Sequence, residues 1–112
     1  IKHIHGAYKD PYKNSIWVTT GDVDGECFLI EFLNENFLNP IFHGDGTQKW
    51  RTVSLMFRED KIFWIMDSPN EVPKLQILDR DTMEVTEGKS FDAPVWYTKR
   101  LSDSSYLAQT SI

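Results

Sequence analysis

The stretch Trp50–Ser68, WRTVSLMFREDKIFWIMDS, decides the fold that the sequence predicts. It consists of an apolar run, the charged corner Arg58–Lys61 and a second apolar run. Strand-forming residues on both sides of a short polar corner are typical of a β-hairpin. We therefore expect one strand that begins at Trp50 and a second strand over Ile62–Met66.

Similar runs lie on both sides of this hairpin, each bounded by residues that favour turns. Before the hairpin they predict strands at Ile1–Tyr8, Ser15–Thr20, Cys27–Leu33 and Phe37–Phe42, with a loop at residues 43–47. After it they predict strands at Lys74–Asp79, Met83–Thr86, Val95–Leu101 and Tyr106–Ile112, with a loop at residues 90–94. The sequence therefore predicts an all-β chain.

The outline of the hairpin recurs along the chain. Aligning the second strand of each hairpin places Ile16, Ile62 and Tyr106 at equivalent positions, with offsets of 46 and 44 residues. A period of this length, holding about four short strands, is the signature of β-propeller blades. We expect antiparallel four-stranded propeller-type blades at residues 1–46 and 47–94 and the start of a third at 95–112. A β-sandwich or meander is the alternative, because short strands at this spacing suit it equally.

Several short segments add detail to this repeat: His3–Gly6, Asp10–Pro11, Ile16–Asp22 with Asp24–Glu26, Gln48–Val53 and Pro94–Tyr97. Together they resemble the β-propellers of the sialidase-like and BNR-repeat kind, over nearly the whole chain and at the level of blade pattern. That family carries a box, Ser-x-Asp-x-Gly-x-Thr-Trp, within each blade. The nearest match, Asp45–Trp50, has its glycine one place early. The box, the glycosidase arginines and the catalytic tyrosine of the family are therefore not carried over.

The repeat also predicts that the chain is incomplete as a propeller. Propellers typically have about 4 to 8 blades, and this chain holds two and the opening hairpin of a third. An open arc exposes strand edges, so we expect either a fragment of a longer propeller or self-association. The first residue, Ile1, is not an initiator methionine, which favours the fragment.

Composition excludes several classes of partner. The net charge is -5, and 12 basic residues are scattered among 17 acidic ones, which argues against nucleic acid. No apolar run approaches the roughly 20 residues of a membrane span, so we expect no membrane partner. The single cysteine, Cys27, excludes an intrachain disulfide framework and leaves the compartment open, with a lean toward the cytoplasm. We expect no cofactor.

Two histidines form the first candidate site. His3 and His5 stand two apart on a predicted strand, so both side chains lie on one face and could bind a metal or flank a substrate. A catalytic zinc site needs a third protein ligand. The spacing does not supply one, although His43 is a candidate. The alternative is a polar strand face whose side chains only form hydrogen bonds.

An acidic loop forms the second candidate. Asp22, Asp24 and Glu26 alternate in the way that carboxylates do around a calcium ion. The full EF-hand pattern fails, because Gly25 is fourth in the loop and Leu33 stands where the bidentate glutamate belongs. We therefore prefer a solvated acidic turn and predict no metal site here. If a metal did bind, these three residues would be the candidate ligands.

A third candidate follows from the repeat, which sets His5 against Arg51 and approximately against Trp96. In a propeller these positions line the central channel, where arginine can bind carboxylates and aromatic rings can pack on sugars. The predicted ligand-binding residues are His3, His5, Trp50, Arg51 and Trp96. For the tryptophans, packing between blades is the alternative.

The predicted function is a propeller-type binding or interaction module of unknown ligand, for which a carbohydrate and a carboxylate are the candidates. One alternative is part of a glycosidase-like or lyase-like propeller enzyme, since fold does not determine function. Another is a self-assembling structural protein that uses its open strand edges.

Overall fold

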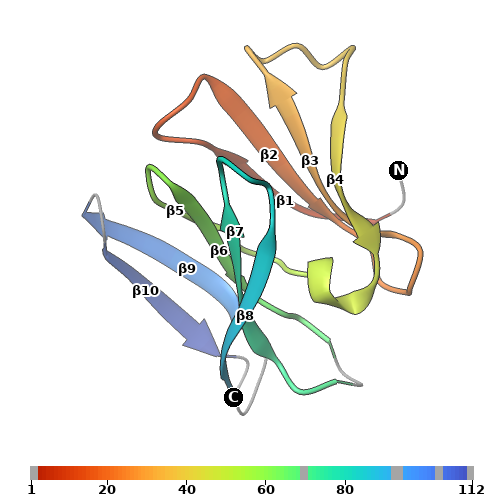
Figure 1. The fold of residues 1–112 in the computed structure, drawn as a ribbon, viewed down its shortest axis with the longest axis vertical. Helices are drawn as coiled ribbons and strands as arrows, with labels where there is room; N and C mark the ends of the chain where they lie inside the picture. The colour runs from red at the N-terminus through yellow and green to blue at the C-terminus, as the bar shows by residue number, and fades with distance from the viewer. Residues whose placement is uncertain (1–2, 69–70, 92–94, 103–104, 111–112) are drawn as a thin grey trace. The chain divides into compact units, whose positions relative to one another are not determined.

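The structure is a computed structural model that describes residues 3–68, 71–91, 95–102 and 105–110. In parts of the last two ranges it describes the backbone alone. The chain forms two compact units, Ile1–Arg51 and Thr52–Ile112. Each unit has its own four-stranded antiparallel sheet (Figure 1). The all-β prediction is therefore confirmed.

The sheet of the first unit is a meander in which strands that are neighbours in sequence pair with one another. Its order is β1-β2-β3-β4, all antiparallel. The elements are β1 (Ile4–Lys9), β2 (Ser15–Thr20), β3 (Cys27–Leu33) and β4 (Ile41–Gly46), followed by a 3-10 turn, η1 (Gln48–Trp50).

The two central strands of this sheet carry its core. Val18 from β2 packs with Ile30 and Phe32 from β3, and Phe28 is packed against them. β-Branched and aromatic residues favour such a half-buried pleated surface, which is why these runs form strands. Leu29 is fully buried and shares β3 with them. The predicted strands Ser15–Thr20 and Cys27–Leu33 are confirmed with the same bounds.

The second unit has a similar meander, in the order β5-β6-β7-β8. Its strands are β5 (Met56–Phe57), β6 (Lys61–Ile65), β7 (Lys74–Asp79) and β8 (Val85–Ser90). Ile62 and Trp64 from β6 and Leu78 from β7 are buried. A separate two-stranded sheet follows, formed by β9 (Val95–Ser102) and β10 (Ser105–Thr110).

One tyrosine joins the two sheets of the second unit. The hydroxyl of Tyr106, in β10, accepts a hydrogen bond from the backbone N–H of Phe57 at 2.8 Å and donates one to its carbonyl at 3.1 Å. Because Phe57 lies in the outermost strand β5, both of its edge-facing backbone groups are satisfied by a side chain.

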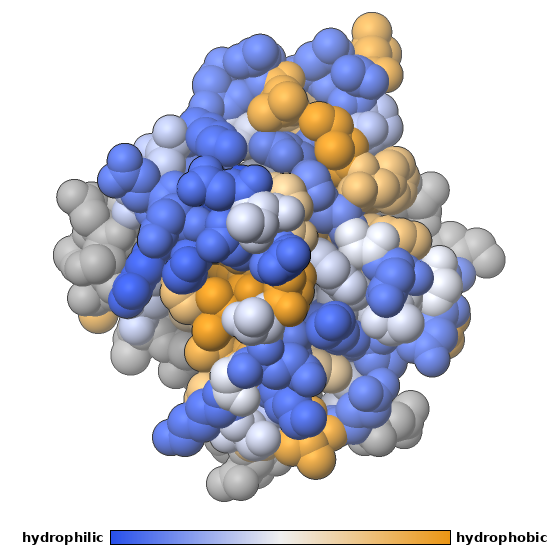
Figure 2. Space-filling model, in the orientation of Figure 1, coloured by the Kyte–Doolittle hydropathy of each residue, from blue (hydrophilic) through white to orange (hydrophobic). Residues whose placement is uncertain are grey.

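The predicted outer strand Phe37–Phe42 and loop 43–47 were misplaced, since β4 runs from Ile41 to Gly46. Phe37 and Leu38 lie in a turn in which the N–H of Asn39 donates to the carbonyl of Asn36 at 3.3 Å. Leu38 is 95% exposed. Figure 2 shows apolar patches on a face that is otherwise mostly hydrophilic.

The first strand of the predicted Trp50 hairpin is also shorter than expected. Trp50 ends η1, and only Met56 and Phe57 pair with the second strand. At Thr52, side-chain hydrogen bonds take the place of regular strand pairing. The Thr52 hydroxyl contacts the carbonyls of Ser54 at 3.0 Å and Ile65 at 3.2 Å. The polar corner itself is confirmed by the bond from the Arg58 N–H to the Lys61 carbonyl at 2.8 Å.

The last strand of the four-stranded sheet in the second unit, β8, begins later and runs further than predicted. Met83 has a φ of 61° and its N–H donates to the carbonyl of Asp79, so it belongs to the turn and not to strand 83–86. The strand β8 continues to Ser90. Of the predicted loop 90–94, residues 92–94 lie outside the described residues. Within the part of the chain that is described, no helix has the length and apolarity needed to cross a membrane.

Candidate functional site

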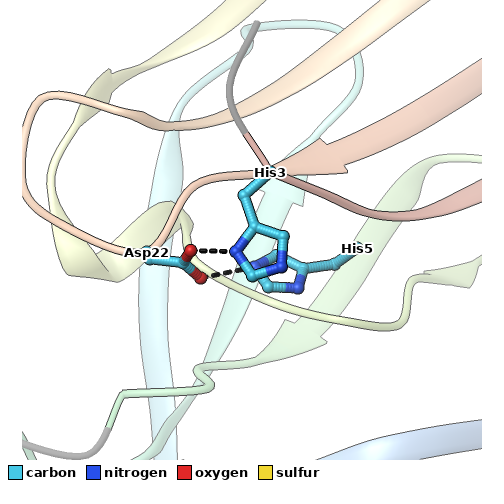
Figure 3. Close-up of side chains that lie close together, drawn as sticks. All are labelled: His3, His5 and Asp22. Carbon is cyan, nitrogen blue, oxygen red and sulfur yellow. Dashed lines mark hydrogen bonds and ion pairs between the residues drawn. The ribbon is translucent and has the colours of Figure 1, made fainter.

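His3, His5 and Asp22 meet at one end of the first sheet (Figure 3). Each offers one ligand atom, and these three atoms lie within 4.8 Å of one another. His3 directly precedes β1, His5 lies in β1, and Asp22 follows β2. The structure thus supplies the third residue that the spacing of the two histidines left open.

The pairing of β1 with β2 explains how these residues meet. The strands are antiparallel, so the start of β1 lies beside the end of β2. Ile4 pairs with Thr20 and Gly6 with Thr19, which leaves His5 as the extra residue of a β-bulge. Bulges re-aim side chains and are frequent beside functional sites.

The backbone before β1 is also unusual. His3 has a φ of 50°, in the left-handed region that residues with a side chain rarely adopt. Its carbonyl accepts a hydrogen bond from the N–H of Gly21 at 3.0 Å, which ties it to the loop that carries Asp22. The two histidines therefore share a side through a bulge and a left-handed residue, and not through simple alternation.

Both imidazoles contact the same carboxylate. His3 Nδ1 is hydrogen-bonded to Asp22 Oδ2, and His5 Nε2 lies 3.1 Å from Asp22 Oδ1. His5 Nε2 also lies 2.9 Å from the carbonyl oxygen of Gly21, which can only accept, so this nitrogen carries a proton in the observed arrangement. The two rings are tilted, with centroids 4.5 Å apart.

Arg51 and Gln48 hold Asp22 from the other side. Arg51 Nη1 donates to the backbone carbonyl of Asp22 at 2.8 Å, and Gln48 Nε2 donates to the same oxygen at 3.3 Å. Arg51 Nη2 lies 3.7 Å from Asp22 Oδ1. Because Arg51 is bound to the main chain of Asp22, it fixes the position of the loop as well as balancing the carboxylate charge.

The side chains of the site differ in their exposure to solvent. The side chain of His3 is 59% exposed and that of Asp22 is 36% exposed, whereas those of His5 and Arg51 are 14% and 15% exposed. A ligand can therefore reach the carboxylate and both imidazoles from the side of His3, while the arginine supports the site from within.

Cys27 lies behind this loop, and its thiol is unreactive. Its thiol is fully buried and donates to the carbonyl of Val23 at 3.4 Å. Burial raises the pKa of this thiol to about 11, although the nearby charge of Arg51 acts in the opposite direction. Because only the thiolate binds metals or attacks electrophiles, Cys27 is not part of the site.

The other predicted metal candidates lie apart from this group. Among the described residues, Asp24 and Glu26 contribute no ligand atom to it. His43, considered as a third ligand, instead lies 3.1 Å from Glu31 Oε1 and stacks on Trp17 with ring centroids 5.0 Å apart. Asp22 is thus the one residue of the acidic loop that joins the histidines.

Of the two predicted ligand-binding tryptophans, Trp50 packs beside this group and contributes no ligand atom to it. Trp50 is 8% exposed, and its ring lies where a side chain on Gly44 would have to be placed. This is the packing alternative for Trp50. Trp96 lies in β9, and its side chain is outside the described residues.

The sequence did not group Gln48 or Asp22 with the two histidines. Gln48 carried no signal. Asp22 was a metal candidate of the acidic loop, and its place beside the histidines follows from the hairpin register of the structure, in which Tyr8 pairs with Trp17 and Ile4 with Thr20. Extending that register by one step places the residue before Ile4 beside the loop at Asp22.

No family model matches the chain, and no curated protein or solved structure matches it significantly.

Proposed function

We propose that this chain is a propeller-type binding module that binds a carbohydrate at the open end of its first sheet. The observation that carries the proposal is the convergence of His3, His5 and Arg51 on Asp22. The sequence alignment placed His5 and Arg51 at equivalent positions of the proposed blades 1–46 and 47–94, and both contact the same aspartate.

The propeller assignment is supported by the pattern of strands. Each unit contains a four-stranded antiparallel meander, the sheet type of a propeller blade. The second strands of the two meanders, β2 and β6, contain the aligned residues Ile16 and Ile62. The proposed blades are residues 1–46 and 47–94, with the start of a third at 95–112. In this proposal, further blades or other copies of the chain complete the arc.

The charges at the site favour a carbohydrate over a carboxylate. Sugar hydroxyls both donate and accept hydrogen bonds, and the site offers an accepting carboxylate in Asp22 and donors in the imidazoles. A carboxylate ligand would be repelled by Asp22, and Arg51 is already engaged with that residue. Trp50 is buried, so a stacking surface for a sugar ring is not provided by this residue.

Glycan-array screening followed by calorimetry with the bound glycan tests this proposal. Asp22→Asn removes the charge and keeps the size of the side chain, and we expect it to weaken glycan binding at least about 10-fold, because hydrogen bonds to a charged group are the stronger ones. Glu35→Gln is a matched control, since Glu35 is an exposed acid that pairs with Lys9. Absence of binding across neutral and acidic glycans, or equal effects of the two variants, would refute the proposal.

A further inference from the structure

We propose that His3, His5 and Asp22 bind one divalent transition-metal ion of the zinc, cobalt or nickel class. The inference uses residues of the proposed carbohydrate site but does not depend on carbohydrate binding. It rests on three observations: the chemical type of the three ligands, their separation, and the contacts that hold them in place.

The ligand types select the metal. Imidazole nitrogens suit zinc, copper, nickel and iron, whereas calcium and magnesium take oxygen ligands. Two imidazoles and one carboxylate are the protein ligands of a zinc site that keeps a fourth position open. This proposal replaces the hypothesis of a calcium site in the acidic loop. The loop contributes one residue, Asp22, to the transition-metal site.

The separations fit an ion of this size. Metal–ligand distances of about 2.0 to 2.2 Å place tetrahedral ligand atoms roughly 3 to 3.5 Å from one another. The three ligand atoms lie within 4.8 Å of one another, so shifts on the order of 1 Å suffice. The ion would take the place of the protons that now lie between the imidazoles and the carboxylate, because metal ligands must be deprotonated.

The surroundings hold the ligands before an ion arrives. Arg51 and Gln48 both donate to the carbonyl of Asp22, and the N–H of Gly21 donates to the carbonyl of His3. Such supporting contacts orient metal ligands and affect metal affinity. The charge of Arg51 opposes a second cation nearby, so we expect micromolar affinity and not the much tighter binding of a structural zinc site.

The open coordination positions face the exposed side. His3 and Asp22 are the exposed members of the group, while His5 is largely covered. A bound ion would therefore present its free positions to water or to an oxygen atom of a ligand from solvent. The structure assigns to this ion a ligand-binding role at the mouth of the site.

Calorimetric titration of the tag-free, chelator-treated chain with zinc chloride tests the inference. We expect one zinc per chain, and at least a 10-fold loss of affinity in each of His3→Ala, His5→Ala and Asp22→Asn. His43→Gln is the matched control, because it removes a histidine of the same sheet outside the group, and its affinity should be unchanged. Absence of zinc binding, or equal losses in His43→Gln and the three variants, would overturn the inference.

Two further measurements keep the test independent of folding and of the carbohydrate proposal. X-ray absorption of the zinc complex of the unaltered chain should show two imidazole ligands and oxygen, and any other ligand set would overturn the inference without a variant. Glycan binding is measured in chelator and in zinc. Zinc binding without glycan binding refutes the carbohydrate proposal alone, and glycan binding without zinc binding refutes the metal site alone.

Discussion

Two glycines of the loop beside the site provide a matched pair for a stability experiment. Gly21 and Gly25 have φ angles of 95° and 93°, so alanine is strained to a similar extent at both positions. The two positions differ in the room that is available for a Cβ atom. A Cβ at Gly21 would lie 2.3 Å from the carbonyl oxygen of Glu26 and 2.7 Å from the Cα of Cys27. At Gly25 a Cβ would meet no atom of the described residues within 4 Å.

The magnitudes follow from this difference. Left-handed backbone costs a residue with a side chain about 1 to 2 kcal/mol, so Gly25→Ala should lower the free energy of unfolding by about that amount. Gly21→Ala bears the same cost and in addition forces main-chain atoms apart, since the contacting atoms belong to the backbone and cannot rotate away. Overpacking of this kind costs about 1 to 3 kcal/mol more.

Urea unfolding followed by tryptophan fluorescence measures both variants. Trp17 and Trp50 are buried in the unit that holds the two glycines, so their emission reports on its unfolding. Gly21→Ala should also weaken zinc binding, because Gly21 contacts both histidines through its backbone. Equal losses of stability in the two variants would refute the steric argument.

Three other changes test separate parts of the structure. Tyr106→Phe removes the hydroxyl that serves both backbone groups of Phe57, and we expect a loss of about 1 to 3 kcal/mol with faster hydrogen exchange of the Phe57 amide; unchanged exchange would contradict this. Burial raises the pKa of the Cys27 thiol from 9.0 to about 11, so the unfolded chain ionises first and stability is lost as the pH rises from 9 to 11, by at most about 3 kcal/mol. Comparison with Cys27→Ala isolates this effect, and parallel pH curves would exclude it. Leu29→Ala should cost about 2 to 5 kcal/mol because Leu29 is fully buried, whereas Leu33→Ala on the same strand, 43% exposed, should cost about 0.5 kcal/mol; similar losses would refute the assigned core.

Strands with a simple composition could be predicted from the sequence. The bounds of β2, β3 and β7 were predicted as observed. Each is a run of apolar or alternating residues that ends at residues with strong turn preferences, so local preference and tertiary packing agree. The two four-stranded meanders follow from the order of these strands and their short connections.

Strands that depend on particular tertiary contacts could not be predicted. The segment His43–Gly46 reads as a loop because of its glycines, yet it is part of β4. Gly44 has a φ of 115° and leaves room for the ring of Trp50, a contact that no local pattern reveals. Likewise, the backbone contacts of Thr52 interrupt a run that looks like a strand.

The candidate site was predictable in part. The shared side of His3 and His5 was expected from their spacing, although a bulge and a left-handed residue bring it about. The grouping of Arg51 with His5 was expected from the repeat. Asp22 was considered only with its neighbours in the acidic loop, because partners across a hairpin are set by register and a bulge shifts that register.

The bond between Tyr106 and Phe57 also bears on how this chain would aggregate. β5 is the outer strand of its sheet and has two residues, and an uncovered outer strand is a template onto which another chain can add. Among the residues that the structure describes, the Tyr106 hydroxyl of the β9–β10 hairpin occupies the free backbone groups of this edge and blocks that addition. Detachment of the hairpin would therefore expose an unpaired, aggregation-prone edge strand in a chain that is otherwise folded. The lag time of aggregation should then follow the rate at which this hairpin lifts, and not the rate of complete unfolding.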